Sequence, residues 1–288
     1  MGTHTIRTSL AGLFMLAALS GCSNDSVTLP DSTNTNAPAL PAVSTMKFDL
    51  DFYGVSAPTL DAQSLSTGAP SDAMLLSASG GDHENWINAY VRAVFIHLST
   101  FDMLEEPIGA FAYAIHSVPR EQPDGSYLWT YIFVDQAIEY SVFLFGTPKQ
   151  DTVEWRMEVS SNDPALLLNH FVWFSGESRH DDTGGYWQFF DPIDQTQGVP
   201  SARIEWTNGN LEDTLTLTVN GSGYENEGDM LTFTDSKSTG SIEYYDASAS
   251  LTSSIIWHAN GTGSLTVPDY NGGAMACWDR EQRNVACQ

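Results

Sequence analysis

Residues 126–159 read SYLWTYIFVDQAIEYSVFLFGTPKQDTVEWRMEV, and this stretch decides the fold class. Along residues 152–159, apolar side chains alternate strictly with polar ones, which is the period of a β-strand with one buried and one solvated face. Residues 126–134 and 138–145 are apolar on both faces, so these two strands need cover on both sides. Because only a few residues separate the three segments, we expect neighbouring strands to run antiparallel.

The same pattern extends over most of the chain. Further strands are predicted at residues 46–53, 167–175, 186–190, 202–207, 214–219, 230–234, 241–245, 251–258, 264–267 and 274–278. The connections carry turn residues, including four Asn-Gly pairs, which favour tight hairpins. A sequential sheet of about a dozen strands is so wide that it should curl. We therefore expect a mainly β fold, a curled antiparallel meander forming an incomplete or closed barrel, with a two-sheet sandwich as the alternative.

Residues 82–117 form the only segment with a helical period. Asp82 can cap a first helix, whose apolar side chains recur at three- and four-residue steps from Trp86 to Leu98. A second helix is expected to begin near Pro107, a residue suited to the first turn of a helix. We expect this helix pair to pack its apolar stripes against the sheet, although it could also act as a lid.

The first 21 residues have the three parts of a secretory signal peptide. The apolar run at residues 10–19 is about ten residues long, whereas a membrane-spanning helix needs roughly 20. The run is followed by Leu19-Ser20-Gly21-Cys22, which resembles the lipobox of bacterial lipoproteins. The resemblance implies cleavage before Cys22, diacylglyceryl lipid on its thiol and acylation of the new amine. The partner it implies is a membrane, and Ser23 resembles the sorting signal for the outer membrane in two-membrane bacteria.

The chain divides into three parts on this reading: a signal peptide at 1–21, a lipidated N-terminus and tether at 22–45, and a single β-rich domain at 46–288. The tether is rich in Ser, Thr, Asn, Pro and Ala without an apolar period, so we expect it to be disordered. In element order, the body resembles the incomplete barrels of periplasmic lipoprotein-carrier and lipid-binding lipoproteins, in which helices plug the concave face. A membrane-spanning barrel is disfavoured, because most predicted strands are shorter than the roughly 9–11 residues that one needs.

Charge and cysteine content narrow the possible partners. The chain has 36 acidic residues against 11 basic ones and a formal net charge of −25, which argues against nucleic acid as a partner. Of the three cysteines, Cys22 is assigned to the lipid, which leaves Cys277 and Cys287 to form a disulfide in an oxidising compartment. A two-thiol metal or redox site is the rival, but the ten-residue step lacks the usual C-x-x-C spacing.

Catalytic and metal-binding signatures are weak in this sequence. The sequence has no G-x-S-x-G elbow, H-E-x-x-H helix, P-loop or EF-hand pattern, and we assign no catalytic residue, metal or cofactor. The loop with His180, Asp181 and Asp182 could coordinate a cation or transfer protons, with a solvated turn as the simpler reading. Residues 225–229 carry three acids and an Asn, which could hold calcium through oxygen ligands.

The strongest functional hint is a bias toward tryptophan. Seven Trp residues each fall on a different predicted strand, and large aromatic side chains either fill a β core or line a cavity. From the second alternative, the candidates for ligand binding are Trp129, Trp155, Trp173 and Trp187. The function expected is non-enzymatic binding of a hydrophobic or aromatic-stacking ligand, including a glycan, by a lipid-anchored envelope protein. The alternatives are an envelope structural or protein-interaction lipoprotein and a surface glycan hydrolase.

Overall fold

The computed structural model describes residues 36–48, 82–101, 104–135, 137–166, 168–192, 200–221, 224 and 226–288. The described residues all belong to one compact unit, 34–288. The predicted signal peptide, Cys22, and the predicted strand beyond Phe48 lie outside the described residues. Within the described part, no helix is both long and apolar enough to cross a membrane.

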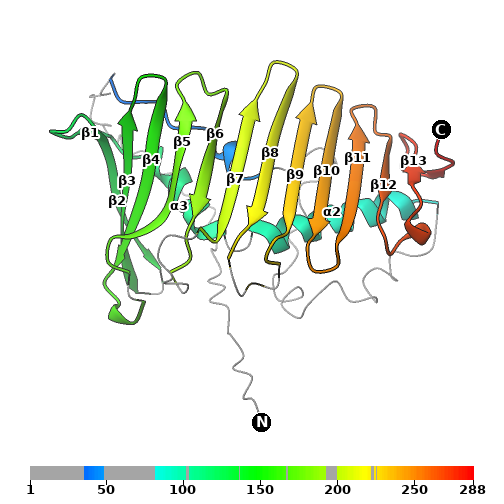
Figure 1. The fold of residues 1–288 in the computed structure, drawn as a ribbon, viewed down its shortest axis with the longest axis horizontal. Helices are drawn as coiled ribbons and strands as arrows, with labels where there is room; N and C mark the ends of the chain where they lie inside the picture. Colours follow the sequence, from blue (N-terminus) through cyan, green and yellow to red (C-terminus); the bar gives the residue numbers. More distant parts are fainter. Residues whose placement is uncertain are drawn as a thin grey trace, which may run out of the picture. The chain divides into compact units, whose positions relative to one another are not determined.

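The body is a single antiparallel sheet in which every strand pairs with the next one along the chain (Figure 1). This result confirms the mainly β meander, in its incomplete form, since the sheet does not close. The strands are β1 Arg120–Glu121, β2 Tyr127–Asp135, β3 Ile138–Pro148, β4 Thr152–Ser161, β5 Phe171–Arg179, β6 Gly184–Phe189, β7 Ala202–Asn208, β8 Glu212–Val219, β9 Met230–Ser236, β10 Thr239–Asp246, β11 Leu251–His258, β12 Gly263–Thr266, β13 Ala276–Trp278 and β14 Asn284–Val285.

Two helices, α2 Glu84–Phe101 and α3 Glu105–Ala114, pack against one face of this sheet. In Figure 1, α2 runs across the strand direction. Its first turns contact β12–β14, and at its other end Phe101 packs edge-on against Phe48, which stacks on Phe233 of β9. The apolar side chains of the helices therefore face the sheet, as their three- and four-residue spacing predicted.

On the covered face, glycines stand opposite tryptophans of the neighbouring strand. A Cβ added to Gly240 would lie 2.1 Å from Cε2 of Trp257, and one added to Gly263 would lie 2.1 Å from Cζ2 of Trp278. The wide indole rings thus fit the core because the adjacent strand has no side chain at that point. The register pairs that follow this rule are Gly146–Trp155, Gly176–Trp187, Gly185–Trp206, Gly240–Trp257 and Gly263–Trp278.

The structure corrects the predicted boundary between the tether and the β-rich domain. Residues 36–45 were assigned to the disordered tether, but Val43–Thr45 form a 3₁₀ turn against the sheet. Thr45 and Met46 are buried, and the Thr45 hydroxyl accepts a hydrogen bond of 3.1 Å from the indole N–H of Trp187. The polar composition of 36–45 hid this contact, because its partner on β6 lies 142 residues away.

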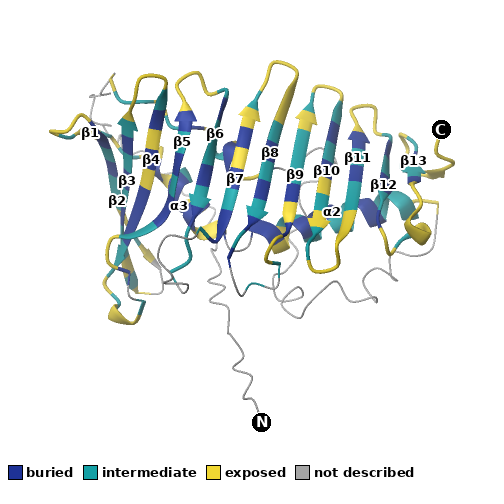
Figure 2. Cartoon of the chain, in the orientation of Figure 1, coloured by how far each residue is buried: buried dark blue, intermediate teal, exposed yellow. Residues whose placement is uncertain are grey.

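Strand β2 was predicted to be covered on both faces, but the described residues cover only one of them. Tyr127 and Trp129 are buried under the helices, whereas Ile132 and Val134, which point to the other face, are 61% and 66% exposed. Figure 2 shows the resulting bands of buried and exposed residues along the strands. The helix pair covers one face of the sheet only.

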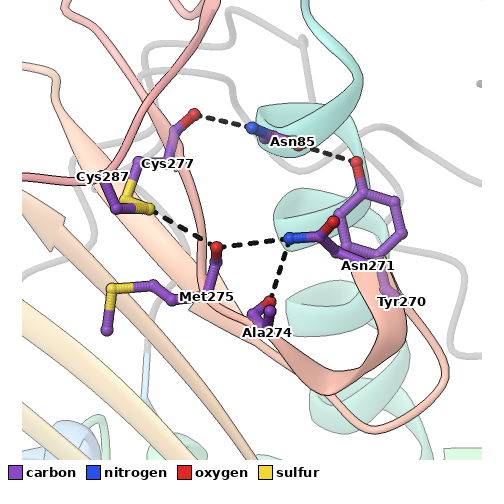
Figure 3. Close-up of a disulfide and its surroundings, with 7 residues drawn as sticks. All are labelled: Asn85, Tyr270, Asn271, Ala274, Met275, Cys277 and Cys287. Atoms are coloured by element: carbon purple, nitrogen blue, oxygen red, sulfur yellow. Dashed lines mark hydrogen bonds between the residues drawn. A yellow bond between two sulfur atoms is a disulfide. The ribbon is translucent and has the colours of Figure 1, made fainter.

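The predicted disulfide between Cys277 and Cys287 is present, with a Cα–Cα distance of 5.3 Å (Figure 3). It fixes the C-terminal tail to β13. Beside it, the Asn85 amide of α2 donates to the Cys277 carbonyl at 2.6 Å and accepts from the Tyr270 hydroxyl at 2.7 Å. The first turn of α2 and the disulfide together hold the last strands of the sheet in place.

Candidate functional site

A groove of about 630 Å³ lies on the face of the sheet that the helices leave uncovered. Its floor consists mainly of outward-pointing side chains of β3 to β6, and the turn between β1 and β2 forms its wall. A volume of this size is within the range of roughly 300–1,000 Å³ for small-molecule sites. The lining residues are Gln122, Pro123, Asp124, Ser126, Phe145, Thr147, Glu154, Trp155, Arg156, Ser175, Gly176 and Tyr186.

The wall of the groove is a hydrogen-bonded turn. Ser126 donates to the Asp124 carboxylate from its backbone N–H at 3.0 Å and from its hydroxyl at 2.7 Å. These hydrogen bonds hold the pKa of Asp124 below its usual value. The turn needs a positive φ at Gly125, +81°, where glycine carries no steric penalty. Asp124 is therefore an ionised hydrogen-bond acceptor at the rim of the groove.

The floor combines the aromatic rings of Phe145 and Tyr186 with the guanidinium group of Arg156. Register pairing places Phe145, Arg156 and Ser175 side by side on β3, β4 and β5. The Arg156 guanidinium lies 5.0 Å from the centre of the Phe145 ring, and that of Arg203 lies 4.3 Å from the centre of the Tyr186 ring. Both distances are typical of cation–π contacts, which hold the guanidinium plane against the ring. The groove thus presents flat groups that a ring-shaped ligand can stack on.

A buried carboxylate lies next to the groove. Glu158 is 7% exposed, and its two carboxylate oxygens contact Nη1 of Arg156 at 2.9 Å and Nδ1 of His170 at 3.0 Å. A β-bulge between Met157 and Glu158 and a φ of +52° at His170 accompany this arrangement. Bulges and positive φ values at non-glycine residues are common where a side chain must be aimed. Here the bulge and the positive φ bring Glu158 and His170 together. Glu158 then holds the Arg156 guanidinium at the groove.

The four tryptophans predicted to bind a ligand are all buried, at 3%, 2%, 5% and 0% exposure for Trp129, Trp155, Trp173 and Trp187. Phe111 of α3 packs against Trp187, and the Trp155 N–H donates to the hydroxyl of Ser178 at 2.9 Å. These contacts favour the core-filling alternative. Of the four, only Trp155 lines the groove.

Apart from Trp155, the groove residues were not predicted from the sequence, because along the strands they alternate with the core residues that were singled out. Phe145 gave the one available signal, since it belongs to a strand that is apolar on both faces. Polar residues such as Gln122, Asp124 and Arg156 have no distinctive spacing along the chain. Only the strand register brings them together.

The other candidate sites serve local structure. His180 Nε2 donates a hydrogen bond to the Lys149 carbonyl at 3.0 Å, and Asp181 accepts hydrogen bonds from Thr183, so this loop is the turn between β5 and β6. The Asp229 carboxylate, from the proposed calcium segment, accepts hydrogen bonds from the Tyr244 hydroxyl and the Ala247 N–H. Glu225 lies outside the described residues. Among those described, no group of three or more His, Cys, Asp or Glu side chains could hold a metal ion.

The fold and the groove together define an open β-meander protein with one helix-covered face and one exposed face that carries the candidate site. A comparison with protein-family models finds none that matches this chain, and a comparison with curated proteins finds none similar to it.

Proposed function

We propose that this protein is a lipid-anchored envelope protein. Its groove binds a ligand that has a flat ring face, and the protein does not convert that ligand chemically. The observation that carries the proposal is the lining of the groove, in which Phe145, Tyr186 and Arg156 offer stacking surfaces beside carboxylate, amide and hydroxyl groups. A few placed polar groups on an aromatic floor are typical of small-molecule sites.

A sugar ring fits this lining better than a purely apolar ligand. Sugars have C–H faces that stack on aromatic rings and hydroxyls that can donate to Asp124 and Glu154 or accept from Arg156. An apolar ligand would remove water from these charged groups without replacing its hydrogen bonds, which is costly. The proposal therefore narrows the expected ligand from hydrophobic or aromatic-stacking molecules in general to a polar ring, such as a glycan unit.

Binding measurements on the purified chain in mild detergent test this proposal. The probes are a panel of envelope and extracellular oligosaccharides, with the fluorescent hydrophobe N-phenyl-1-naphthylamine as the apolar probe. We expect an oligosaccharide to bind, and we expect Arg156→Ala or Tyr186→Ala to weaken binding by about tenfold or more, since each removes a stacking group. Arg280→Ala is the matched control, because Arg280 lies outside the groove and pairs with Glu281.

Two outcomes would contradict the proposal: no oligosaccharide binds, or binding is insensitive to both groove substitutions. Binding of the hydrophobe with the same sensitivity to the groove substitutions would indicate that the ligand is a hydrophobic molecule.

The groove also holds two carboxylates, Asp124 and Glu154, so glycan hydrolysis is the second candidate function. Release of shorter oligosaccharides that is lost in Glu154→Gln would favour hydrolysis over binding.

The lipid anchor is tested separately. Mass spectrometry of the N-terminal peptide should find the chain beginning at Cys22 with diacylglyceryl and acyl groups attached. Cys22→Ser should release the protein from the membrane fraction, because a chain without lipid loses about 0.8 kcal/mol of binding for each buried methylene. An unmodified N-terminus upstream of Cys22 in membrane-bound protein would exclude this anchor.

A further inference from the structure

The two edge strands of the sheet differ in how their outward backbone groups are paired. At one edge, β14 is two residues long; the Asn284 side chain accepts from the Asn85 N–H of α2 at 2.9 Å, and its backbone N–H donates to the carbonyl of Asp82, just before α2. At the other edge, β1 pairs only with Tyr127 and Leu128 of β2. Among the described residues, the rest of β2 has a strand partner on its β3 side alone.

Among the described residues, no strand pairs with the outward backbone groups of β2 beyond Leu128. The Gln122 N–H donates to the Ser126 carbonyl at 2.8 Å across the β1–β2 turn, so the backbone groups of Ser126 point toward β1 and away from β3. Because backbone groups alternate in direction along a strand, Thr130, Ile132 and Val134 also direct their N–H and C=O groups away from β3. These three residues form a template for another strand.

The side chains at this edge are apolar and exposed. Ile132 and Val134 are 61% and 66% exposed, and the end of α3 adds Tyr113 at 60% and Ile115 at 59%. The Tyr113 ring lies 5.5 Å from that of Tyr131, which places the end of α3 beside β2. Natural sheets protect an open edge with charge, proline or cover, yet residues 127–134 contain none of the charged residues that dominate this chain. An exposed apolar edge of this kind marks an interaction surface.

We propose that this edge pairs with a second copy of the chain, β2 against β2 in antiparallel orientation about a two-fold axis. An antiparallel strand is complementary to itself under two-fold rotation. With the axis at Ile132, each Thr130 would lie opposite Val134 of the other copy, and all outward backbone groups would be paired. Two chains of net charge −25 repel each other, so they meet most favourably where the strand carries no charge. The pairing joins two sheets into one continuous sheet.

Sedimentation of the full chain in mild detergent, from about 1 to 100 μM, tests this pairing. We expect a dimer whose dissociation constant rises at least about 30-fold in Ile132→Lys, the effect of losing a central interface residue. Leu211→Lys is the matched control, because Leu211 is 83% exposed in the β7–β8 turn. Ile132→Pro is the second variant, since it removes only an outward N–H and leaves the ladder with β3 intact. Circular dichroism should show both Ile132 variants folded.

Amide hydrogen exchange provides a second measurement on the unmodified chain. The amides of Thr130, Ile132 and Val134 should exchange slowly at high protein concentration and rapidly at low concentration. Three outcomes would overturn the proposal: a monomer at all concentrations, a dimer that survives both Ile132 variants, or protection that does not depend on concentration. The last would mean that another segment of the same chain covers the edge. None of these outcomes bears on ligand binding in the groove.

Discussion

The substitution Trp187→Ala distinguishes a core-filling tryptophan from a ligand-binding one. Trp187 is fully buried between the sheet and α3, with its ring centre 5.6 Å from that of Phe111 and 5.4 Å from that of Phe174. Its N–H also donates to Thr45. Truncation therefore leaves a cavity and detaches the 36–48 segment from its anchor on β6.

The expected cost follows from these contacts. Replacing a buried Trp by Ala destabilises proteins by about 3–5 kcal/mol, of which the lost hydrogen bond is about 1 kcal/mol. For a body of this size, each kcal/mol lowers Tm by roughly 2–4 °C, so we expect a fall of about 6–20 °C. In urea, the unfolding midpoint should fall by about 1–2 M.

The matched control is Tyr186→Ala, one residue earlier on the same strand. Tyr186 points to the groove and contacts Arg203 on the outer face, so its loss should cost only about 1 kcal/mol. Both variants are compared by thermal and urea unfolding of the chain in mild detergent. Equal destabilisation by the two substitutions, or a loss of less than about 1 kcal/mol in Trp187→Ala, would refute the assignment of Trp187 to the core.

Three further predictions concern two glycines, the C-terminal disulfide and the carboxyl group of Asp246. Gly263→Ala should destabilise by about 1–3 kcal/mol in thermal unfolding, because the new Cβ would overlap the Trp278 ring; Gly109→Ala, with open space in α3, should instead stabilise by about 0.5–1 kcal/mol. Reducing the C-terminal disulfide should lower the free energy of unfolding by about 3 kcal/mol, and an unchanged melting curve after reduction would contradict this. The pKa of Asp246 should lie below 3.8 in an NMR titration, because hydrogen bonds from the following turn stabilise its ionised form. This contribution to stability is present above pH 3.8 and is lost as the pH falls through the lowered pKa, so a measured pKa at or above 3.8 would exclude it.

Much of the fold could be predicted because the signals are local. The period of two at residues 152–159 and the three- and four-residue steps after Asp82 record which side chains face the core, and both elements formed where expected. Some predicted element boundaries were wrong, because the position where a strand begins also depends on contacts outside the local pattern. A strand was predicted at residues 167–175, but β5 begins at Phe171, directly after His170 with its positive φ.

The candidate site could be predicted less well than the fold. The tryptophans were correctly placed on separate strands, but the period of two cannot say which face of a doubly apolar strand is covered. The structure turns Trp155 and Trp187 toward the helices and leaves Phe145 and Tyr186 facing the groove. Alternate residues of the same strands thus face opposite sides of the sheet. The helix pair determines which side becomes the buried core and which side carries the groove.

The sequence by itself determined the β-strands, the helix pair, the pairing of Cys277 with Cys287 and the expectation of a lipid on Cys22, because each depends on neighbouring residues or on a simple count. Only the tertiary structure decided that the sheet stays open, that 36–45 pack on β6, and that Asp124, Arg156 and Tyr186 share one groove. These outcomes depend on strand register and on contacts between residues far apart in the chain, such as Asn85 with Asn284 across 199 positions. Such contacts are selected by the packing of the whole core, and no local pattern encodes them.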